Sequence, residues 1–294
     1  MTEFAGSLVA IVTPMRPDGA IDYAAWSRLI DFHLQNGTSG VVVGGTTGES
    51  ATLLDGELKE LTQRACAQVA GRIPIVAGAG TSSTAATLER VRWLSQLPID
   101  ALLIVTPAYN KPSQEGLYRH FAAAAESSSV PVILYNVPGR TSVDMLPETV
   151  GRLSHLPRIV AVKEAVPQIE RVRALLAECR AGFGVLSGDD ATAREAILAG
   201  ARGVISVTAN AAPRTMADMV AAAQRAEVAR AEMLDARLLR LHHALFLEAN
   251  PIPVKWALAR MGLIDSGIRL PLTELAAMYH VAVIEALRGA GALN

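Results

Sequence analysis

The four lysines of this chain lie in very different surroundings. The sequence contains 23 arginines but only four lysines, Lys59, Lys111, Lys163 and Lys255. Lys59 lies on the charged side of a predicted helix, Lys111 in a loop, and Lys255 in a C-terminal helix where its stem can extend to water. Lys163 instead ends the apolar run Ile159–Lys163, which is typical of a buried strand. Lys163 is therefore the candidate for chemistry.

A buried lysine at this position has two interpretations. Alternation along the strand places Lys163 on one face with Ile159 and Ala161, and the small Ala161 favours the face that points into the fold. Burial there disfavours the charged ammonium and leaves a neutral amine that can attack a carbonyl carbon. A structural lysine paired with Glu164 or another acid fits the position equally well.

Three other segments offer groups that such chemistry needs. Tyr135 ends the preceding strand and can relay protons through its hydroxyl, although an aromatic residue that only caps the core would look the same. Arg140 follows the rigid Pro138-Gly139 turn and can bind a carboxylate in bidentate fashion, although alone it is more typical of a solvated loop. The segment Gly44–Gly48 offers hydroxyls and backbone N–H groups to a small carboxylate, or is simply a tight turn.

The sequence contains no comparable pattern for binding a metal or a nucleotide. None of the six histidines forms the His-x-x-x-His spacing of a helical zinc pair. Asp189-Asp190 could hold Mg²⁺, but adjacent acids in a loop more often cap a helix, here predicted over Thr192–Ala199. No Gly-x-Gly-x-x-Gly follows the first strand, and no Gly-Lys-Ser/Thr occurs. We expect neither a metal nor a cofactor.

A regular series of short strands and amphipathic helices must position these residues. Apolar runs without polar alternation predict eight strands that are covered on both faces, as in a parallel sheet. These runs are Ser7–Thr13, Gly40–Val43, Ile73–Ala77, Ala101–Val105, Val132–Tyr135, Ile159–Lys163, Gly184–Ser187 and Gly203–Val207. The stretches between them predict helices over Tyr23–Asn36, Asp55–Val69, Thr84–Gln96, Gln114–Ser127, Pro147–Leu153, Ile169–Ala177, Thr192–Ala199 and Pro213–Ala223.

Eight strand–helix units predict a closed (β/α)₈ TIM barrel, an α/β fold, within residues 1–224. The main rival is a doubly wound open sheet, which here lacks its glycine motif. Residues 225–294 predict a C-terminal three-helix appendage over Val228–Glu248, Ile252–Met261 and Thr273–Arg288. Barrel active sites lie at the carboxyl ends of the strands, and the polar and glycine-rich segments of this chain follow its predicted strands.

Composition narrows the function classes further. Of the 294 residues, 51% are hydrophobic and 19% are charged, which excludes intrinsic disorder. The net charge of −1 provides no basic excess, which argues against binding to a nucleic acid as the function. No apolar run approaches the roughly 18–20 residues of a membrane span. The opening Met1–Phe4 lacks the positive charge of an export signal, and Cys66 and Cys179 lie in apolar helical stretches. We expect a cytoplasmic protein without disulfides.

Six motifs, in order, resemble the dihydrodipicolinate synthase family of the pyruvate-dependent class I aldolase superfamily, which also contains N-acetylneuraminate lyase. They are Gly45-Thr-Thr-Gly-Glu49, Tyr109-Asn-Lys-Pro112, Tyr135-Asn-Val-Pro-Gly-Arg-Thr141, Lys163-Glu164, Ser187-Gly-Asp-Asp190 and Asn250-Pro-Ile-Pro-Val-Lys255. The resemblance runs nearly the whole length of the chain. It implies a cofactor-free condensation of pyruvate with L-aspartate 4-semialdehyde to 4-hydroxy-tetrahydrodipicolinate, the first committed step of diaminopimelate and lysine synthesis.

The resemblance also implies residue roles. Lys163 would form a Schiff base with pyruvate, and Tyr135, Thr46 and Tyr109 would form a proton relay. Tyr109 would reach in from the neighbouring subunit, so a homodimer is the minimal active unit, and the family commonly forms a homotetramer. The binding residues would be Thr46 and Thr47 for the pyruvate carboxylate, Arg140 for the semialdehyde carboxylate, and Gly188 and Ile205 for the backbone lining of the lysine pocket.

The chain departs from the family pattern beside the lysine. Lys163-Glu-Ala-Val-Pro167 stands where Lys-Glu-Ala-Thr-Gly is usual, so a sister aldolase acting on a sugar acid or another aldehyde remains an alternative, although Arg140 argues against it. A non-catalytic barrel that binds a 2-oxo acid is an alternative of another class.

A second departure concerns feedback inhibition by lysine. Ala108 precedes Tyr109 where a second tyrosine is common, and Ala86 stands where lysine-sensitive members carry an acid. At other positions of the family's allosteric lysine pocket this chain has Asp55, Leu58 and Ser82. Only Ser50 and Ala51 match the lysine-sensitive members. An ammonium needs an acid partner, so we expect weak or absent inhibition by lysine.

Overall fold

The structure is a computed structural model that describes residues 4–293. The expectation about an export signal rests partly on residues 1–3, which lie outside the described residues. No helix within the described range is long and apolar enough to cross a membrane.

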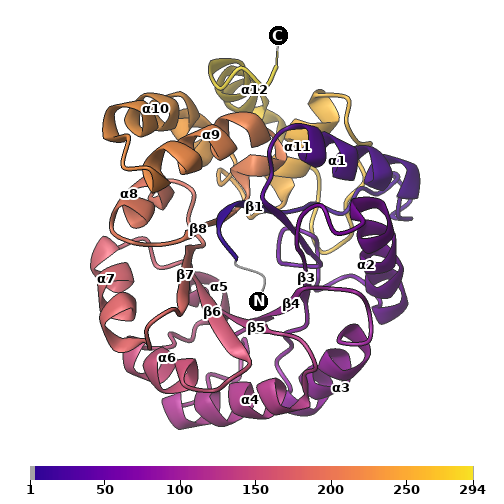
Figure 1. Ribbon diagram of the computed structural model, residues 1–294. Helices are drawn as coiled ribbons and strands as arrows, with labels where there is room; N and C mark the ends of the chain where they lie inside the picture. Colours follow the sequence, from indigo (N-terminus) through magenta and orange to yellow (C-terminus); the bar gives the residue numbers. More distant parts are fainter. Residues whose placement is uncertain (1–3, 294) are drawn as a thin grey trace.

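Eight parallel strands close into a barrel, in which each strand pairs with the next along the chain and β8 pairs with β1. The strands are β1 Gly6–Ala10, β2 Gly40–Val43, β3 Ile75–Gly78, β4 Ala101–Val105, β5 Val132–Asn136, β6 Ile159–Glu164, β7 Gly184–Ser187 and β8 Gly203–Ser206. Figure 1 shows this ring of strands inside a ring of helices. The predicted (β/α)₈ barrel is confirmed.

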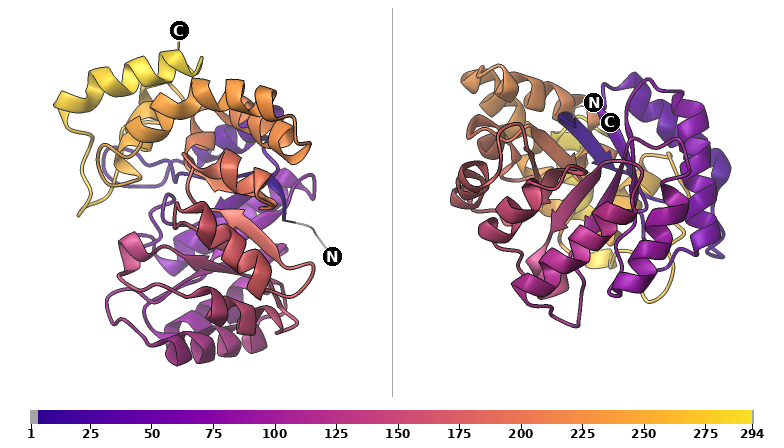
Figure 2. Two further views of the ribbon diagram at one scale, coloured as in Figure 1. Left: turned by 90° about the vertical axis from the view of Figure 1, so that its left-hand side faces the viewer. Right: turned by 60° about the horizontal axis from the view of Figure 1, so that its bottom comes forward.

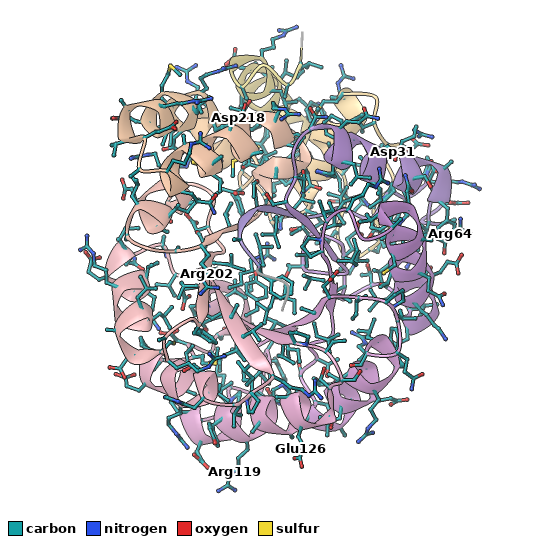
Figure 3. All side chains as sticks on the ribbon, viewed as in Figure 1. Asp31, Arg64, Arg119, Glu126, Arg202 and Asp218 are labelled. Atoms are coloured by element: carbon teal, nitrogen blue, oxygen red, sulfur yellow. The ribbon has the colours of Figure 1, made fainter. Side chains whose placement is uncertain are left out.

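The outer ring is formed by helices that connect the strands. They are α1 Tyr23–Gln35, α2 Asp55–Val69, α3 Thr84–Leu94, α4 Gln114–Ser127, α5 Pro138–Thr141, α6 Pro147–Ser154, α7 Ile169–Glu178, α8 Ala193–Leu198 and α9 Pro213–Gln224. Their starts follow local chemistry: the carboxylate of Asp22 accepts the N–H groups of Ala24 and Ala25, and Pro147 and Pro213 open α6 and α9. Charged side chains such as Arg64, Arg119 and Glu126 project outward from this ring (Figure 3).

The barrel interior holds a small apolar cluster, separate from the larger core between strands and helices. Its buried members are Phe4, Leu8, Ala10, Val42, Val76, Ala101, Leu103, Ile133, Tyr135, Ala161, Leu186 and Ile205. The placement of Ala161 in the interior agrees with the predicted face of Lys163. The expectation that Ile159 shares this face is wrong, because the register between β5 and β6 shifts at Val132/Ile133 and Ile159 joins the outer core.

The C-terminal region adds α10 Val228–Ala244, α11 Ile252–Arg260 and α12 His280–Gly289. These orange and yellow helices lie together on one side of the barrel, where α10 packs against α9 and α12 (Figure 2, left). The expected helix start at Thr273 is wrong. Leu275 is buried and the Ala276 N–H donates to Glu248, which holds this segment extended until the 3₁₀ turn Ala277–Tyr279. The division into domains 1–224 and 225–294 stays a prediction.

Candidate active site

Lys163 and Tyr135 lie side by side near the carboxyl ends of neighbouring strands. They are register partners on β6 and β5, and both are nearly buried, at 5% and 6% exposure. The Lys163 Nζ atom lies 4.4 Å from the centre of the Tyr135 ring, on which a cation or an amine packs favourably. No carboxylate among the described residues forms an ion pair with Lys163. The structural interpretation of Lys163 therefore lacks the partner that it requires.

Space beside the lysine is kept open by Gly188, directly after β7. A Cβ atom at Gly188 would lie 3.0 Å from Lys163 Cε and 3.1 Å from the carbonyl oxygen of Glu164. A side chain at this position would therefore press on the lysine. Ile205 is 1% exposed on β8 and belongs to the same interior cluster as Tyr135.

A cavity of about 440 Å³ opens at this end of the barrel. Thr46, Val137, Arg140 and Thr141 line part of it. A smaller recess is lined by Thr46 and Tyr135 together with glycines at and after the ends of β2 and β3, and it shares Thr46 with the cavity. Thr46 lines both spaces. Thr46 thus lies between the cavity that Arg140 lines and the recess that Tyr135 lines.

Thr47 and Arg140 are held by one residue of the C-terminal region. The Thr47 hydroxyl is buried and accepts a hydrogen bond from Asn250 Nδ2 at 2.9 Å. Arg140 lies in the one-turn helix α5, where the sequence predicted only a turn, and its Nη2 donates to the Asn250 carbonyl oxygen at 3.0 Å. The other guanidinium N–H groups of Arg140 stay available to a bound carboxylate, whereas Thr47 is buried and lines neither the cavity nor the smaller recess described above.

Tyr109 is the one proposed relay residue that this single chain leaves apart. Its side chain is 93% exposed, and its backbone has φ of 74°, a conformation that non-glycine residues rarely adopt. The Tyr109 N–H donates to the Thr141 carbonyl oxygen at 3.4 Å, which ties its loop to the segment after β5. A large exposed aromatic side chain in a fixed backbone conformation fits a contact with a second subunit.

The residue after the lysine belongs to a buried polar network on the other side of β6. Asn136 Nδ2 donates to both carboxylate oxygens of Glu164 at 3.1 Å and to Asp144 Oδ1 at 2.8 Å, and Arg171 pairs with Asp144. Burial raises the pKa of Glu164 to about 7, against the hydrogen bonds from Val166 and Asn136, which lower it. Glu164 therefore serves the backbone around Lys163 rather than the lysine itself.

The interpretation of Lys255 as a residue whose stem extends to water is wrong. Lys255 is 3% exposed and forms an ion pair with Glu49, which is also 3% exposed. Arg269 reinforces this contact, because its backbone N–H donates to Glu49 at 3.2 Å. Glu49, Asn250 and Arg269 were not recognised as site residues from the sequence. The signals were two resemblance motifs, Gly45–Glu49 and Asn250–Lys255, which gave no role to Glu49, Asn250 or Lys255.

The other polar candidates have structural partners. Asp189 accepts hydrogen bonds from the N–H and the hydroxyl of Thr192 in the turn before α8. The expectation that these acids cap the helix is wrong, because Thr192 is the N-cap of α8 and no side chain among the described residues caps it. Asp190 accepts the N–H groups of Val207 and Thr208 after β8. The described residues contain no group of three His, Cys, Asp or Glu side chains that could hold a metal ion.

Neither cysteine competes as a nucleophile. Cys66 and Cys179 are free, and burial raises the pKa of each thiol to about 11. Both thiols therefore stay protonated at neutral pH, and the thiolate is the reactive form.

Comparisons with known proteins agree with this geometry. Residues 3–290 match the model of the dihydrodipicolinate synthetase family. The 4-hydroxy-tetrahydrodipicolinate synthases of Methylococcus capsulatus and Ectopseudomonas mendocina are 54% and 55% identical, over 98% of this chain and 99% of theirs. Crystal structures of dihydrodipicolinate synthases from Acinetobacter baumannii, with pyruvate, and Cyanidioschyzon merolae, with lysine, superpose with TM-scores of 0.97 and 0.95. Their sequences are 47% and 36% identical to this chain, and each match covers 99% of it and 100% of the other chain. This chain belongs to the dihydrodipicolinate synthetase family.

Proposed function

We propose that this protein condenses pyruvate with L-aspartate 4-semialdehyde to give 4-hydroxy-tetrahydrodipicolinate. The curated relatives that match the chain over nearly its full length carry this activity in their names. The observation that carries the proposal is the buried Lys163 amine over the ring of Tyr135. Tyr135 lines the recess with Thr46, and Thr46 and Arg140 line the larger cavity.

The chemistry needs one nucleophile and one relay. Lys163 Nζ attacks the C2 carbonyl carbon of pyruvate, and loss of water gives a Schiff base. Removal of a methyl proton gives the enamine, whose carbon bonds to the aldehyde carbon of the semialdehyde. The amino group of the semialdehyde then attacks C2, closes the ring and displaces Lys163. Tyr135, Thr46 and Tyr109 pass the protons that these steps release and consume.

Binding of the substrates uses the two carboxylate-binding groups at the cavity. Thr46 and Thr47 hold the pyruvate carboxylate through hydroxyl and backbone N–H donors. Arg140 binds the carboxylate of the semialdehyde, since a guanidinium fork matches carboxylate geometry. Gly188 leaves room for Lys163 to carry pyruvate, and Ile205 lines the lysine pocket with its backbone. We propose a homodimer as the minimal active unit, because Tyr109 is exposed in one chain, and a homotetramer as the full assembly.

Trapping of the Schiff base tests the proposal. Borohydride reduction in the presence of pyruvate should attach a pyruvate-derived group to Lys163, which peptide mass spectrometry locates. Lys163→Ala should abolish the adduct and lower turnover at least about 1,000-fold, because no other amine can replace the nucleophile. Lys59→Ala, which removes an exposed lysine of α2, is the matched control and should retain both properties.

Two outcomes would contradict the proposal. Full activity of Lys163→Ala would exclude the mechanism. Turnover of a sugar acid but not of the semialdehyde, in a panel of aldehydes offered with pyruvate, would favour a sister aldolase.

A further inference from the structure

A segment of the C-terminal region contacts the loop after β2 at two points. The first contact is the ion pair between Lys255 Nζ, on α11, and Glu49 Oε1. The second is the hydrogen bond from Asn250 Nδ2 to the Thr47 hydroxyl. The two residues of the segment are only five positions apart, whereas more than 200 positions separate them from the loop.

Glu49, one member of the ion pair, is also hydrogen-bonded to Thr46 through the backbone. Glu49 has φ of 60°, and its backbone N–H donates to the Thr46 carbonyl oxygen at 3.1 Å. Its carboxylate is fixed from two sides, by Lys255 and by the backbone N–H of Arg269. The conformation at Glu49 is one that non-glycine residues rarely adopt, so outside contacts must hold it.

Stability alone explains this pair poorly. Moving two charges into the interior costs about as much as their attraction returns, so a buried ion pair is weak evidence for stability. What such a pair does provide is a fixed geometry, because an unpaired charge at this depth would be costly. Here the fixed geometry is that of the segment Gly45–Glu49, which places Thr46 at the cavity and Thr47 next to it in the chain.

We propose that the segment Asn250–Lys255 positions the carboxylate-binding loop, with Lys255 acting through Glu49 and Asn250 acting through Thr47. This inference rests on the proposed function, which assigns the pyruvate carboxylate to Thr46 and Thr47. Lys255, Glu49 and Asn250 are then positioning residues. They prepare the loop before pyruvate arrives, so binding does not have to order it.

The expected signature is a rise in the KM for pyruvate. The carboxylate of pyruvate remains bound to the loop throughout the reaction, so a loosened carboxylate contact weakens substrate and transition state equally. We expect the KM for pyruvate to rise about tenfold. When only the Thr47 contact is lost, kcat should change less than about threefold, and when the Glu49–Lys255 pair is lost it should fall further, because Thr46 also belongs to the proposed relay.

The test compares two double variants. Glu49→Gln with Lys255→Met removes both buried charges at once, which avoids the unpaired charge that a single substitution would leave. Arg194→Met with Asp235→Asn is the matched control. It removes an ion pair from the packing of α8 on α10, at 19% and 13% side-chain exposure, away from the loop. Pyruvate dependence is measured by steady-state kinetics and by borohydride trapping on Lys163.

Asn250→Ala provides a second, independent measurement. It removes the hydrogen bond to Thr47 but leaves both charges of the ion pair in place, so it serves even if circular dichroism finds the first double variant unfolded. A higher KM for pyruvate is expected here as well.

The outcomes separate this inference from the proposed function. A raised pyruvate requirement in the folded loop variants, with the control unchanged, supports the inference. Unchanged pyruvate dependence in a folded loop variant, or an equal rise in the control, overturns the inference while trapping in the unsubstituted protein upholds the proposed function. Absence of any adduct in the unsubstituted protein overturns both.

Discussion

At the scale of single residues, the neighbours of Lys163 explain how a lysine can be a nucleophile here. One side of its amine faces the Tyr135 ring, and Gly188 contributes no side chain that could crowd it. No ion pair holds the amine in place among the described side chains. An amine in such surroundings stays free to form a covalent bond.

The hydroxyl of Tyr135 can be tested apart from its ring. Tyr135→Phe keeps the aromatic face under Lys163 Nζ and should leave the fold intact. Because only the proton relay is lost, we expect kcat to fall roughly 100-fold or more, the usual contribution of a general acid–base group. Stopped-flow kinetics would show the lower kcat, and borohydride trapping of the pyruvate adduct on Lys163 should be slower. Unchanged kcat would remove Tyr135 from the relay.

The buried carboxyl group of Glu164 should make the unfolding free energy of the protein depend on pH. Its pKa lies at about 7 in the folded protein against an ordinary 4.5, mainly through burial. The raised value means that the folded state binds the proton more tightly than the unfolded state. This contribution is fully present below about pH 4.5 and is lost as the pH rises through about 7. Relative to Glu164→Gln, the unsubstituted protein should therefore lose roughly 1–3 kcal/mol of unfolding free energy across this window.

Urea unfolding at several pH values measures this difference. Glu126→Gln, at an exposed position on α4, is the control and should run parallel to the unsubstituted protein. A constant difference between Glu164→Gln and the unsubstituted protein from acid to neutral pH would contradict the prediction.

At the scale of elements, the sequence determined the strands and the lysine better than the contacts between distant segments. The apolar runs marked all eight strands because both faces of a barrel strand are buried. Lys163 could be placed inward from alternation together with the small Ala161, although Ile159 does not share that face. Lys255 could not be placed, because its burial depends on Glu49, which lies 206 positions away. The same limit hid the contacts of Asn250 and Arg269.

The prediction about inhibition by L-lysine concerns residues at and near helices α2 and α3. The 440 Å³ cavity extends to Ser50, Ser82 and Arg90, and Arg90 Nε donates to Asp55 Oδ1 at 2.8 Å. The carboxylate of Asp55 is thus already paired. The guanidinium groups of Arg90 and Arg140, which line the cavity, repel an ammonium. We expect L-lysine to change turnover by less than about twofold, well below a typical allosteric coupling.

A lysine titration of turnover tests this prediction. Ala86→Glu adds a second acid beside Arg90, on the same helix face, so two carboxylates then share one guanidinium, and this matched variant should gain affinity for lysine. Strong inhibition of the unsubstituted protein at low lysine concentration would refute the expectation.

At the scale of the whole molecule, the exposed Tyr109 gives the proposed dimer a consequence that can be tested. Its 93% exposed side chain sits at the end of the barrel where the cavity opens, since its N–H binds Thr141, a cavity-lining residue. A relay that includes Tyr109 therefore requires a second copy of the chain. In a two-fold symmetric dimer, each subunit gives its tyrosine to the other and receives one in return.

Mixing two inactive proteins tests this exchange. Lys163→Ala lacks the nucleophile and Tyr109→Phe lacks the donated hydroxyl, so each homodimer has two damaged sites. A heterodimer has one site with both defects and one with neither, because the tyrosine comes from the opposite subunit. Random re-association of equal amounts should restore about a quarter of the unsubstituted activity. If Tyr109 instead served the site of its own chain, every site would keep one defect, and mixing would restore nothing beyond the residual activity of the two homodimers.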